Sequence, residues 1–299
     1  MIPFVDAHVH LWDLSHIRYP WLTPPFRPGP AGVTEPIAVD YGLDAYLADA
    51  AKWNVKGIVH VDAGADPRDA LKETEWLQGM AGARGMPQAI VAFAALNGPG
   101  LDSLLAAHVK YRNVRGIRHI AGWHADPIRS YSARDLLQEA DWIRGFALLK
   151  KYGLSFDCQV YPSQFPAMAA LAANHPEIPV IVNHLGMPIL ADRDGERTWR
   201  DGLKKLAALP HVAIKLSGVG FIRRDWTAET IRPFLLTAID LFGPKRCMVA
   251  SDFPTDKLFA SFDRHLTAYH EILSAFTEDE RRDLFGRNAN RIYRMTLEV

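Results

Sequence analysis

Four residues carry the chemistry to which this sequence points most directly: His8, His10, His184 and Asp252. In His8-Val9-His10, two imidazoles fall on the same side of an extended strand, because side chains alternate with a period of two. Two imidazoles that converge at a strand end suit a divalent metal or a substrate oxygen. With 12 histidines in 299 residues, the spacing alone is weak evidence, and a pair of structural histidines is the alternative.

Asp252 closes the apolar run that begins at Cys247, and His184 closes the run that begins at Pro179. If the first and last strands of a closed barrel are neighbours, Asp252 can complete a metal shell with His8 and His10. It can equally take a proton from an attacking water. The alternatives are a carboxylate that caps the following loop, and a histidine that only packs.

Seven further side chains are candidates for substrate binding: Arg118, Gln159, Tyr161, Lys215, Trp12, Trp21 and Trp123. The first four fall on the inward side of their strands and would hold hydroxyls or a carboxylate. The tryptophans would supply an apolar wall for a sugar ring. Arg118, Gln159 and Lys215 also fit an ion-paired or hydrogen-bonded barrel interior, so that alternative stays open.

The two-residue period makes further predictions about the neighbours of these residues. Asp6 shares the face of His8 and His10. The residues between them point the opposite way: Val5, Ala7 and Val9. His265 falls on a helical stretch, where we expect it at the solvated surface.

Eight short apolar runs must position these side chains. They begin at Phe4, Gly57, Ala89, Val114, Ser155, Pro179, Val212 and Cys247. Segments with helical spacing lie between them, as in LDAYLADAAKWN from Leu43. Eight such units predict one α/β domain over residues 1–299, a (β/α)8 TIM barrel with its chemistry at the carboxyl ends of the strands. A doubly wound open sheet is the structural alternative.

Two additions to the barrel are expected. Tyr19 to Tyr41 is too long for a routine connection and predicts a flap after the first strand. An extra C-terminal helix is expected after the last barrel unit.

Composition and charge exclude several classes of protein. With 48% hydrophobic and 23% charged residues, the chain has the composition of a globular protein. Lys+Arg and Asp+Glu both total 34, so no global field recruits nucleic acid or an anionic membrane. Cys158 and Cys247 lie in apolar runs and are predicted to be buried thiols. The absence of a membrane span or a signal peptide pattern indicates a cytoplasmic protein, and an oligomer is compatible with the sequence.

Six motifs taken together resemble the amidohydrolase superfamily, in its amidohydrolase-related (type 2) branch. They are DAHVH, GIRH, NHLGMP, KLSG, FGPKRCMVASDFP and FGRNANRIY, in that order along essentially the whole chain. Within the branch, the HLWDL and YPWL opening and the GIRH and KLSG strands are most similar to the group of sugar lactonases and 2-pyrone-4,6-dicarboxylate lactonases.

The resemblance implies a hydrolase with His8, His10, His184 and Asp252 at its centre and Asp252 activating water. This sequence departs from the superfamily at two metal positions. The bridging Lys or Glu of the fourth strand is replaced by a sequence that reads Arg115-Gly116-Ile117-Arg118, and Gln159 or Asp157 stands nearest to the place of the histidine of the fifth strand. We therefore expect one divalent metal, with zinc favoured, on His8, His10 and Asp252, or no required metal.

The function that follows is hydrolysis of a small lactone, with a sugar aldonolactone favoured over a dicarboxylate. Arg118 and Lys215 are the only inward-facing cations on the predicted strands, too few to form an arginine fork for each of two carboxylates. Two alternatives remain: a metal-dependent decarboxylase of the same branch, and a non-catalytic barrel that binds a ligand.

Overall fold

Eight parallel strands form a nearly closed barrel in the computed structural model, which describes residues 2–299. Each strand is hydrogen-bonded to the next in chain order, and a parallel bridge between Val9 and Phe253 returns the last strand to the first. The strands are β1 (Phe4–Val9), β2 (Val55–Val61), β3 (Ala89–Phe93), β4 (Val114–Arg118), β5 (Ser155–Cys158), β6 (Val180–Val182), β7 (Val212–Leu216) and β8 (Cys247–Val249). The predicted barrel is confirmed, and the open sheet is excluded.

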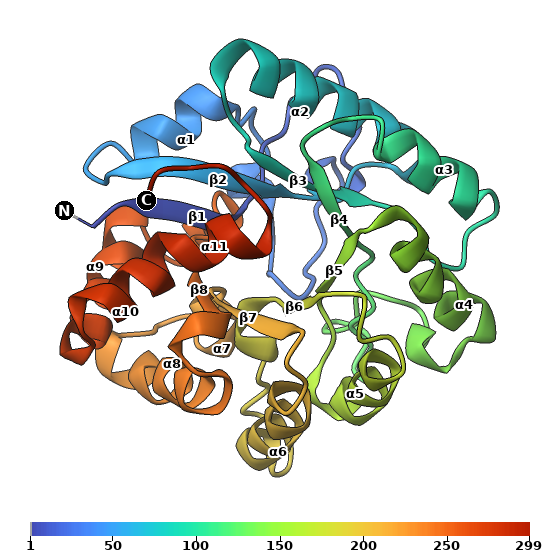
Figure 1. Ribbon diagram of the computed structural model, residues 1–299. Helices are drawn as coiled ribbons and strands as arrows, with labels where there is room; N and C mark the ends of the chain where they lie inside the picture. Colours follow the sequence, from blue (N-terminus) through green and yellow to red (C-terminus); the bar gives the residue numbers. More distant parts are fainter. Residues whose placement is uncertain (1) are drawn as a thin grey trace.

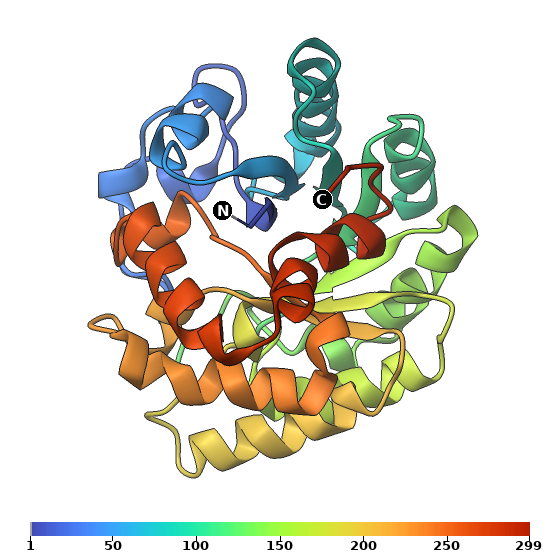
Figure 2. The ribbon, with the colours of Figure 1, turned by 60° about the vertical axis from the view of Figure 1, so that its left-hand side comes forward.

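A ring of helices surrounds the strands (Figure 1). Those that alternate with the strands are α1 (Leu43–Asp49), α2 (Ala70–Arg84), α3 (Leu101–His108), α4 (Ala140–Leu148), α5 (Phe165–Ala173), α6 (Gly195–Ala207), α8 (Ala228–Phe242) and α9 (Phe262–Ile272). Three short helices are additional: α7 (Val219–Ile222), α10 (Glu278–Arg282) and α11 (Asn288–Ile292). The expected C-terminal helix is therefore present, and both termini lie at the same end of the barrel beside it (Figures 1 and 2).

Alternate residues of the strands divide into two buried clusters. The inner one fills the barrel with side chains such as Val61, Val91 and Met248, and Tyr293 from the C-terminal segment belongs to it. The outer cluster packs the other face of the strands, such as Ile90, against the helices. The polar side chains that line a cavity lie at the carboxyl end of the barrel, where enzymes of this fold place their chemistry.

β1 breaks the strict alternation that its sequence predicts. Val5 and Ala7 lie in the inner cluster, whereas Val9 lies in the outer one. Pairing with β2 shifts register between Asp6 and Val9. A bulge of this kind reverses which face the following residues occupy. The prediction of one shared face for Val5, Ala7 and Val9 is therefore wrong.

Asp6 lies on the outer side of β1, on the face opposite to the side chains of His8 and His10. Its carboxylate accepts hydrogen bonds from the Tyr46 hydroxyl on α1 (2.9 Å) and from the Ser251 backbone N–H (2.8 Å). Burial raises the pKa of Asp6 to about 6. Asp6 thus ties β1 to the end of β8 and to the first helix.

The flap predicted over Tyr19 to Tyr41 has defined local structure. It contains two single-turn 3₁₀ helices, Pro20–Leu22 and Glu35–Ile37. Its end is fixed by an antiparallel bridge between Trp12 and Tyr41. The flap therefore returns to the residues that follow β1 and stays close to the carboxyl end of the barrel.

His265 on α9 is buried, so its predicted place at the surface is wrong. Its Nε2 lies 3.3 Å from an oxygen of the buried Asp256, and its ring packs against Trp226 with centroids 4.8 Å apart. Helical spacing shows that a residue is on a helix, but only the packing partners decide which side faces the barrel.

Both cysteines, Cys158 on β5 and Cys247 on β8, are buried free thiols, as predicted. Within residues 2–299, none of the helices combines the length and the apolar character needed to cross a membrane.

Candidate active site

Three histidines and one aspartate meet at the carboxyl end of the barrel. His10 Nε2 lies 3.2 Å from both His8 Nε2 and Asp252 Oδ1, and His8 Nε2 lies 3.5 Å from the same oxygen. His184 Nδ1 lies 3.8 Å from Asp252 Oδ2. The sequence predicted these four residues as one centre, and the fold brings them together.

Unusual backbone conformations aim two of these side chains. Asp252 has φ of 59° and His184 has φ of 53°, in the left-handed region that non-glycine residues rarely occupy. Such residues cluster at functional sites, where the surrounding structure holds them. Here Asp252 N–H donates to the His8 carbonyl (2.9 Å). At Gly218, a Cβ would lie 2.6 Å from His184 Cβ, so glycine is needed where β7 ends.

Burial keeps the imidazoles of the centre neutral. It lowers the pKa of His10 to about 3 and that of His184 to about 4, and it lowers the pKa of His8 well below its ordinary value. The cation of Lys215 adds to the effect at His8, and that of Arg118 at His10. At neutral pH, each ring therefore offers one N–H and one lone pair.

Asp252 is the electrostatic centre of the group. It is 1% exposed, and neither carboxylate oxygen has a hydrogen-bond partner among the described residues. Burial raises its pKa, while His184, Arg118 and Lys215 oppose the shift. A buried carboxylate without hydrogen bonds is costly, so Asp252 requires a proton, a cation or a polar substrate beside it.

The donors present fit a divalent metal. His8, His184 and Asp252 each offer one ligand atom, and these atoms lie within 4.8 Å of one another. His10 reaches the same oxygen of Asp252 and supplies a fourth candidate. Imidazole and carboxylate are common zinc ligands, and the orphaned carboxylate supports the fit.

A cavity of about 430 Å³ opens onto this centre. Its polar lining includes His10, Arg118, Gln159, His184 and Asp252. The flap supplies much of the remaining wall, including Pro20, Trp21, Pro25, Phe26 and Pro30. A pocket with an apolar wall and a few convergent polar groups is typical of a small-molecule site.

Arg118 lines the cavity but is already engaged. Its Nε lies 3.3 Å from Asp62 Oδ2, and its Nη1 donates to Gln159 Oε1 (3.0 Å). Lys215, by contrast, does not line the cavity. It is fully buried beneath the centre, 2.5 Å from Asp157 Oδ1 and 3.2 Å from His8 Nδ1.

Of the three candidate tryptophans, one lines the cavity and two do not. Trp21 lines the cavity and donates its Nε1–H to the Ala63 carbonyl (2.8 Å). Trp12 is buried behind it, with ring centroids 5.5 Å apart, so it supports Trp21 and does not line the cavity. Trp123 lies in the segment after β4 and lines neither this cavity nor its neighbour.

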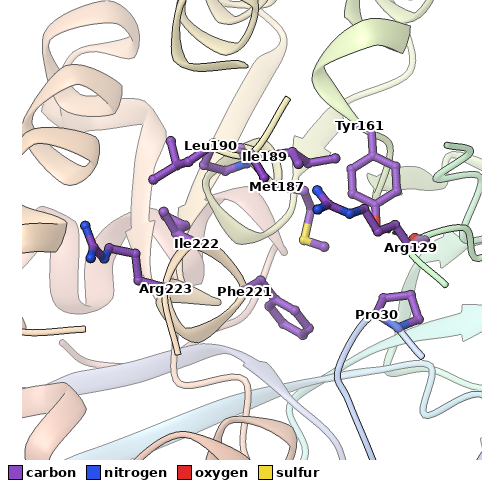
Figure 3. Close-up of a pocket in the computed structure, with 11 residues that line it drawn as sticks. Pro30, Arg129, Tyr161, Met187, Ile189, Leu190, Phe221, Ile222 and Arg223 are labelled. Carbon is purple, nitrogen blue, oxygen red and sulfur yellow. Dashed lines mark hydrogen bonds between the residues drawn. The ribbon is translucent and has the colours of Figure 1, made fainter. Parts of the chain in front are cut away.

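Tyr161 belongs to a neighbouring cavity of about 460 Å³ (Figure 3). Its hydroxyl donates to the Arg129 carbonyl, and Met187 and Phe221 also line this space. Pro30 and Phe221 line both cavities, which places the two side by side. Tyr161 is therefore not brought to the centre of Asp252.

Sequence reasoning missed several residues that line the central cavity, among them Arg27, Tyr131 and Phe221. Each lies in a connecting segment or short helix after a strand, where no periodic pattern gives the direction of a side chain. The proline-rich composition around Arg27 was the one available signal that the flap could contribute.

The amidohydrolase family model matches residues 5–295, which is nearly the whole chain. The chain belongs to the amidohydrolase family. An L-fucono-1,5-lactonase of Burkholderia multivorans is 32% identical over 303 residues, covering 97% of this chain and 95% of the relative. An uncharacterized protein of Sinorhizobium fredii is 40% identical over 295 residues, covering 98% and 99%.

A crystal structure of an amidohydrolase from Burkholderia multivorans with bound zinc is similar in fold. It is 30% identical, with a TM-score of 0.80, and the match covers 98% of this chain and 99% of that one. At the level of the family, these relatives support a hydrolase, and the lactonase among them supports lactone hydrolysis.

Proposed function

We propose that this chain hydrolyses a small lactone and that its substrate is a sugar aldonolactone. The observation that carries the proposal is Asp252, a buried carboxylate that has no hydrogen-bond partner among the described residues and that lines the cavity beside three neutral imidazoles. A base in this position is suited to activating water, and the lactonase relative supports an intramolecular ester as the target.

In this mechanism, Asp252 takes a proton from water, and the water oxygen bonds to the lactone carbonyl carbon. N–H donors on His8 and Arg118 stabilise the resulting oxyanion, a contribution of about 3–4 kcal/mol for a well-placed donor. The bond between the carbonyl carbon and the ring oxygen then breaks. His184 donates its N–H proton to that oxygen and takes up the proton held by Asp252, beside which it lies, so one water is added, a hydroxy acid is released and both side chains return to their starting state.

His8, His184 and Asp252, with His10 as a further candidate, would hold a divalent metal at this centre. When bound, zinc supplies Lewis acidity and lowers the pKa of water. The zinc of the related Burkholderia structure supports zinc as the ion.

An uncharged substrate fits the charges in the cavity better than a dicarboxylate. Arg118 is paired with Asp62, and Lys215 is withdrawn beneath the centre, so neither is free to form a bidentate contact with a carboxylate. Arg27 is the exception, because it is exposed on the flap side of the cavity and makes no ion pair with any residue in 2–299. One free cation can serve one carboxylate, but not two.

The test is a panel of aldonolactones assayed with a pH indicator, beside a pyrone dicarboxylate and a hydroxybenzoate at equal ionic strength. We expect kcat/KM to be highest for an aldonolactone. Loss of ultraviolet absorbance with release of CO₂ from the hydroxybenzoate, without lactone hydrolysis, would instead identify a decarboxylase. A dicarboxylate preferred by more than tenfold would contradict the substrate class, and binding without turnover of any compound would indicate a ligand-binding barrel.

A further inference from the structure

A fully buried chain of polar groups leads from Tyr293, in the C-terminal segment, to the active centre. The Tyr293 hydroxyl lies 2.9 and 3.1 Å from the two oxygens of Asp157. Lys215 Nζ lies 2.5 Å from Asp157 Oδ1 and 3.2 Å from His8 Nδ1. All four residues are 0% exposed. The proposed reaction uses His8 alone of these, so the chain behind it requires a separate explanation.

The contact between Lys215 and His8 fixes the direction of one hydrogen bond. A lysine ammonium, here paired with Asp157, has three donors and no acceptor. His8 Nδ1 must therefore accept, and in a neutral ring the only proton is then on Nε2.

His10 has the opposite arrangement. Its Nδ1 lies 2.7 Å from the Val61 carbonyl oxygen, which can only accept, so Nδ1 carries the proton and Nε2 carries the lone pair. The contact of 3.2 Å between His8 Nε2 and His10 Nε2 then has one donor and one acceptor. Every contact from Lys215 through His8 and His10 to Val61 therefore has one donor and one acceptor. Hydrogen bonds in such a chain polarise and strengthen one another.

This polarity is the reverse of the usual second shell of a metal-binding histidine. A ligating histidine normally donates its second N–H to a carbonyl or a carboxylate, as His10 does to Val61. His8 instead receives a hydrogen bond from an ammonium, which leaves Nε2 protonated and without a lone pair for a metal.

We propose that Lys215 is a positioning residue that holds His8 as the Nε2–H tautomer. His8 is thereby a hydrogen-bond donor toward the reacting centre, and an ion bound there depends on His10, His184 and Asp252. This inference rests on the proposed function for the role of His8, but not for its tautomer. On this proposal, the buried pair of Lys215 and Asp157 lowers the affinity of the centre for a metal and favours the binding of an oxyanion.

The first test is nitrogen NMR of the resting, metal-free chain with ¹⁵N-labelled histidine. We expect a protonated Nε2 and a lone-pair Nδ1 for His8, and the reverse pattern for His10 in the same sample. Spectra of His8→Gln and His10→Gln assign the signals. A protonated Nδ1 on His8 would overturn the proposal. Because no substrate is present, the result is independent of whether the chain is a lactonase.

The second test is zinc affinity, measured by competition with a chromophoric chelator. Asp157→Asn with Lys215→Met removes both buried charges and frees His8 Nδ1 to carry the proton. We expect zinc to bind on the order of tenfold more tightly, the scale of other second-shell effects on metal affinity. Tyr293→Phe is the matched control, because it alters the same chain without touching His8, and should leave zinc affinity unchanged.

Equal zinc affinity in the wild type and in the folded double variant would contradict the proposal. Circular dichroism establishes folding. If the double variant does not fold, the NMR result on the wild-type chain decides alone.

Discussion

At the scale of single residues, the site is organised around one carboxylate. Asp252 lies within 3.5 Å of two imidazole nitrogens, and burial lowers the pKa of both rings so that neither is a cation at neutral pH. A base surrounded by neutral rings keeps its charge available for a proton from water. In the proposed reaction, proton transfer from water therefore depends on the Asp252 carboxylate.

Asp252→Asn tests this role with no change in side-chain volume. We expect a folded protein whose kcat falls by about 10²–10⁴, the usual contribution of a general base. Steady-state kinetics on the best lactone measure the loss, and the melting temperature serves as the folding control. Activity within about tenfold of the wild type would remove Asp252 from the role of base.

At the scale of elements, the bulge in β1 separates residues that pack in the barrel from a residue that lines the cavity. Val5 and Ala7 before it fill the barrel, Val9 after it packs in the outer cluster, and His10 lines the cavity. Asp6 lies on the outer side of this bulge, where Tyr46 and Ser251 donate to it. Burial of the charged Asp6 carboxylate lowers the free energy of unfolding by an amount that depends on pH.

Asp6→Asn should therefore change how stability depends on pH. The pKa of Asp6 is about 6 in the fold, against an ordinary value of 3.8. A carboxyl with a raised pKa contributes stability below about pH 4 that is lost as the pH rises through about 6. The amide keeps an acceptor for Ser251 and places a donor beside Tyr46.

We expect the variant to match the wild type near pH 4 and to exceed it at pH 8 by up to about 3 kcal/mol, from about two pH units at about 1.4 kcal/mol each. Urea unfolding at both pH values measures the difference. A difference that does not change between pH 4 and pH 8 would show that Asp6 does not titrate in this range.

Two helical glycines differ in how closely neighbouring atoms pack against them. At Gly145 of α4, a Cβ would lie 1.8 Å from the Leu96 carbonyl oxygen, whereas at Gly82 of α2 it would meet nothing within 4 Å. Gly145→Ala should destabilise by about 1–3 kcal/mol or more through overpacking. Gly82→Ala should stabilise by about 0.5–1 kcal/mol, because alanine favours the helix. Thermal melts of the two variants should shift in opposite directions.

At the scale of the whole molecule, the barrel closes through its backbone. Asp252 N–H donates to the His8 carbonyl (2.9 Å), and His10 N–H donates to the Phe253 carbonyl (2.8 Å). These bonds join the first and last strands at the site itself. Closure of the barrel is therefore independent of an ion.

Chelation should accordingly leave the fold intact. We expect a shift in melting temperature of no more than about 4 °C, the size of an effect near 1 kcal/mol in a chain of this class. Elemental analysis before chelation should find no more than one divalent ion per chain. Two tightly held ions, or unfolding on their removal, would contradict this account of the site.

The sequence alone determined the barrel and the four residues of its centre. Eight apolar runs with helical segments between them specify the strands, because burial on both faces requires continuous apolar residues. Polar residues where such runs end must then meet at one end of the barrel. His8, His10, His184 and Asp252 could be chosen on that ground before any contact was known.

Only the tertiary structure decided which side chains line the cavity. The bulge in β1 moved Asp6 outward, the packing of α9 buried His265, and Lys215 was withdrawn beneath His8 by its pairing with Asp157. Arg27 and Tyr161 lie in connections whose course no periodicity specifies. Strand alternation is a local rule, whereas bulges, helix orientation and buried ion pairs depend on partners distant in the chain.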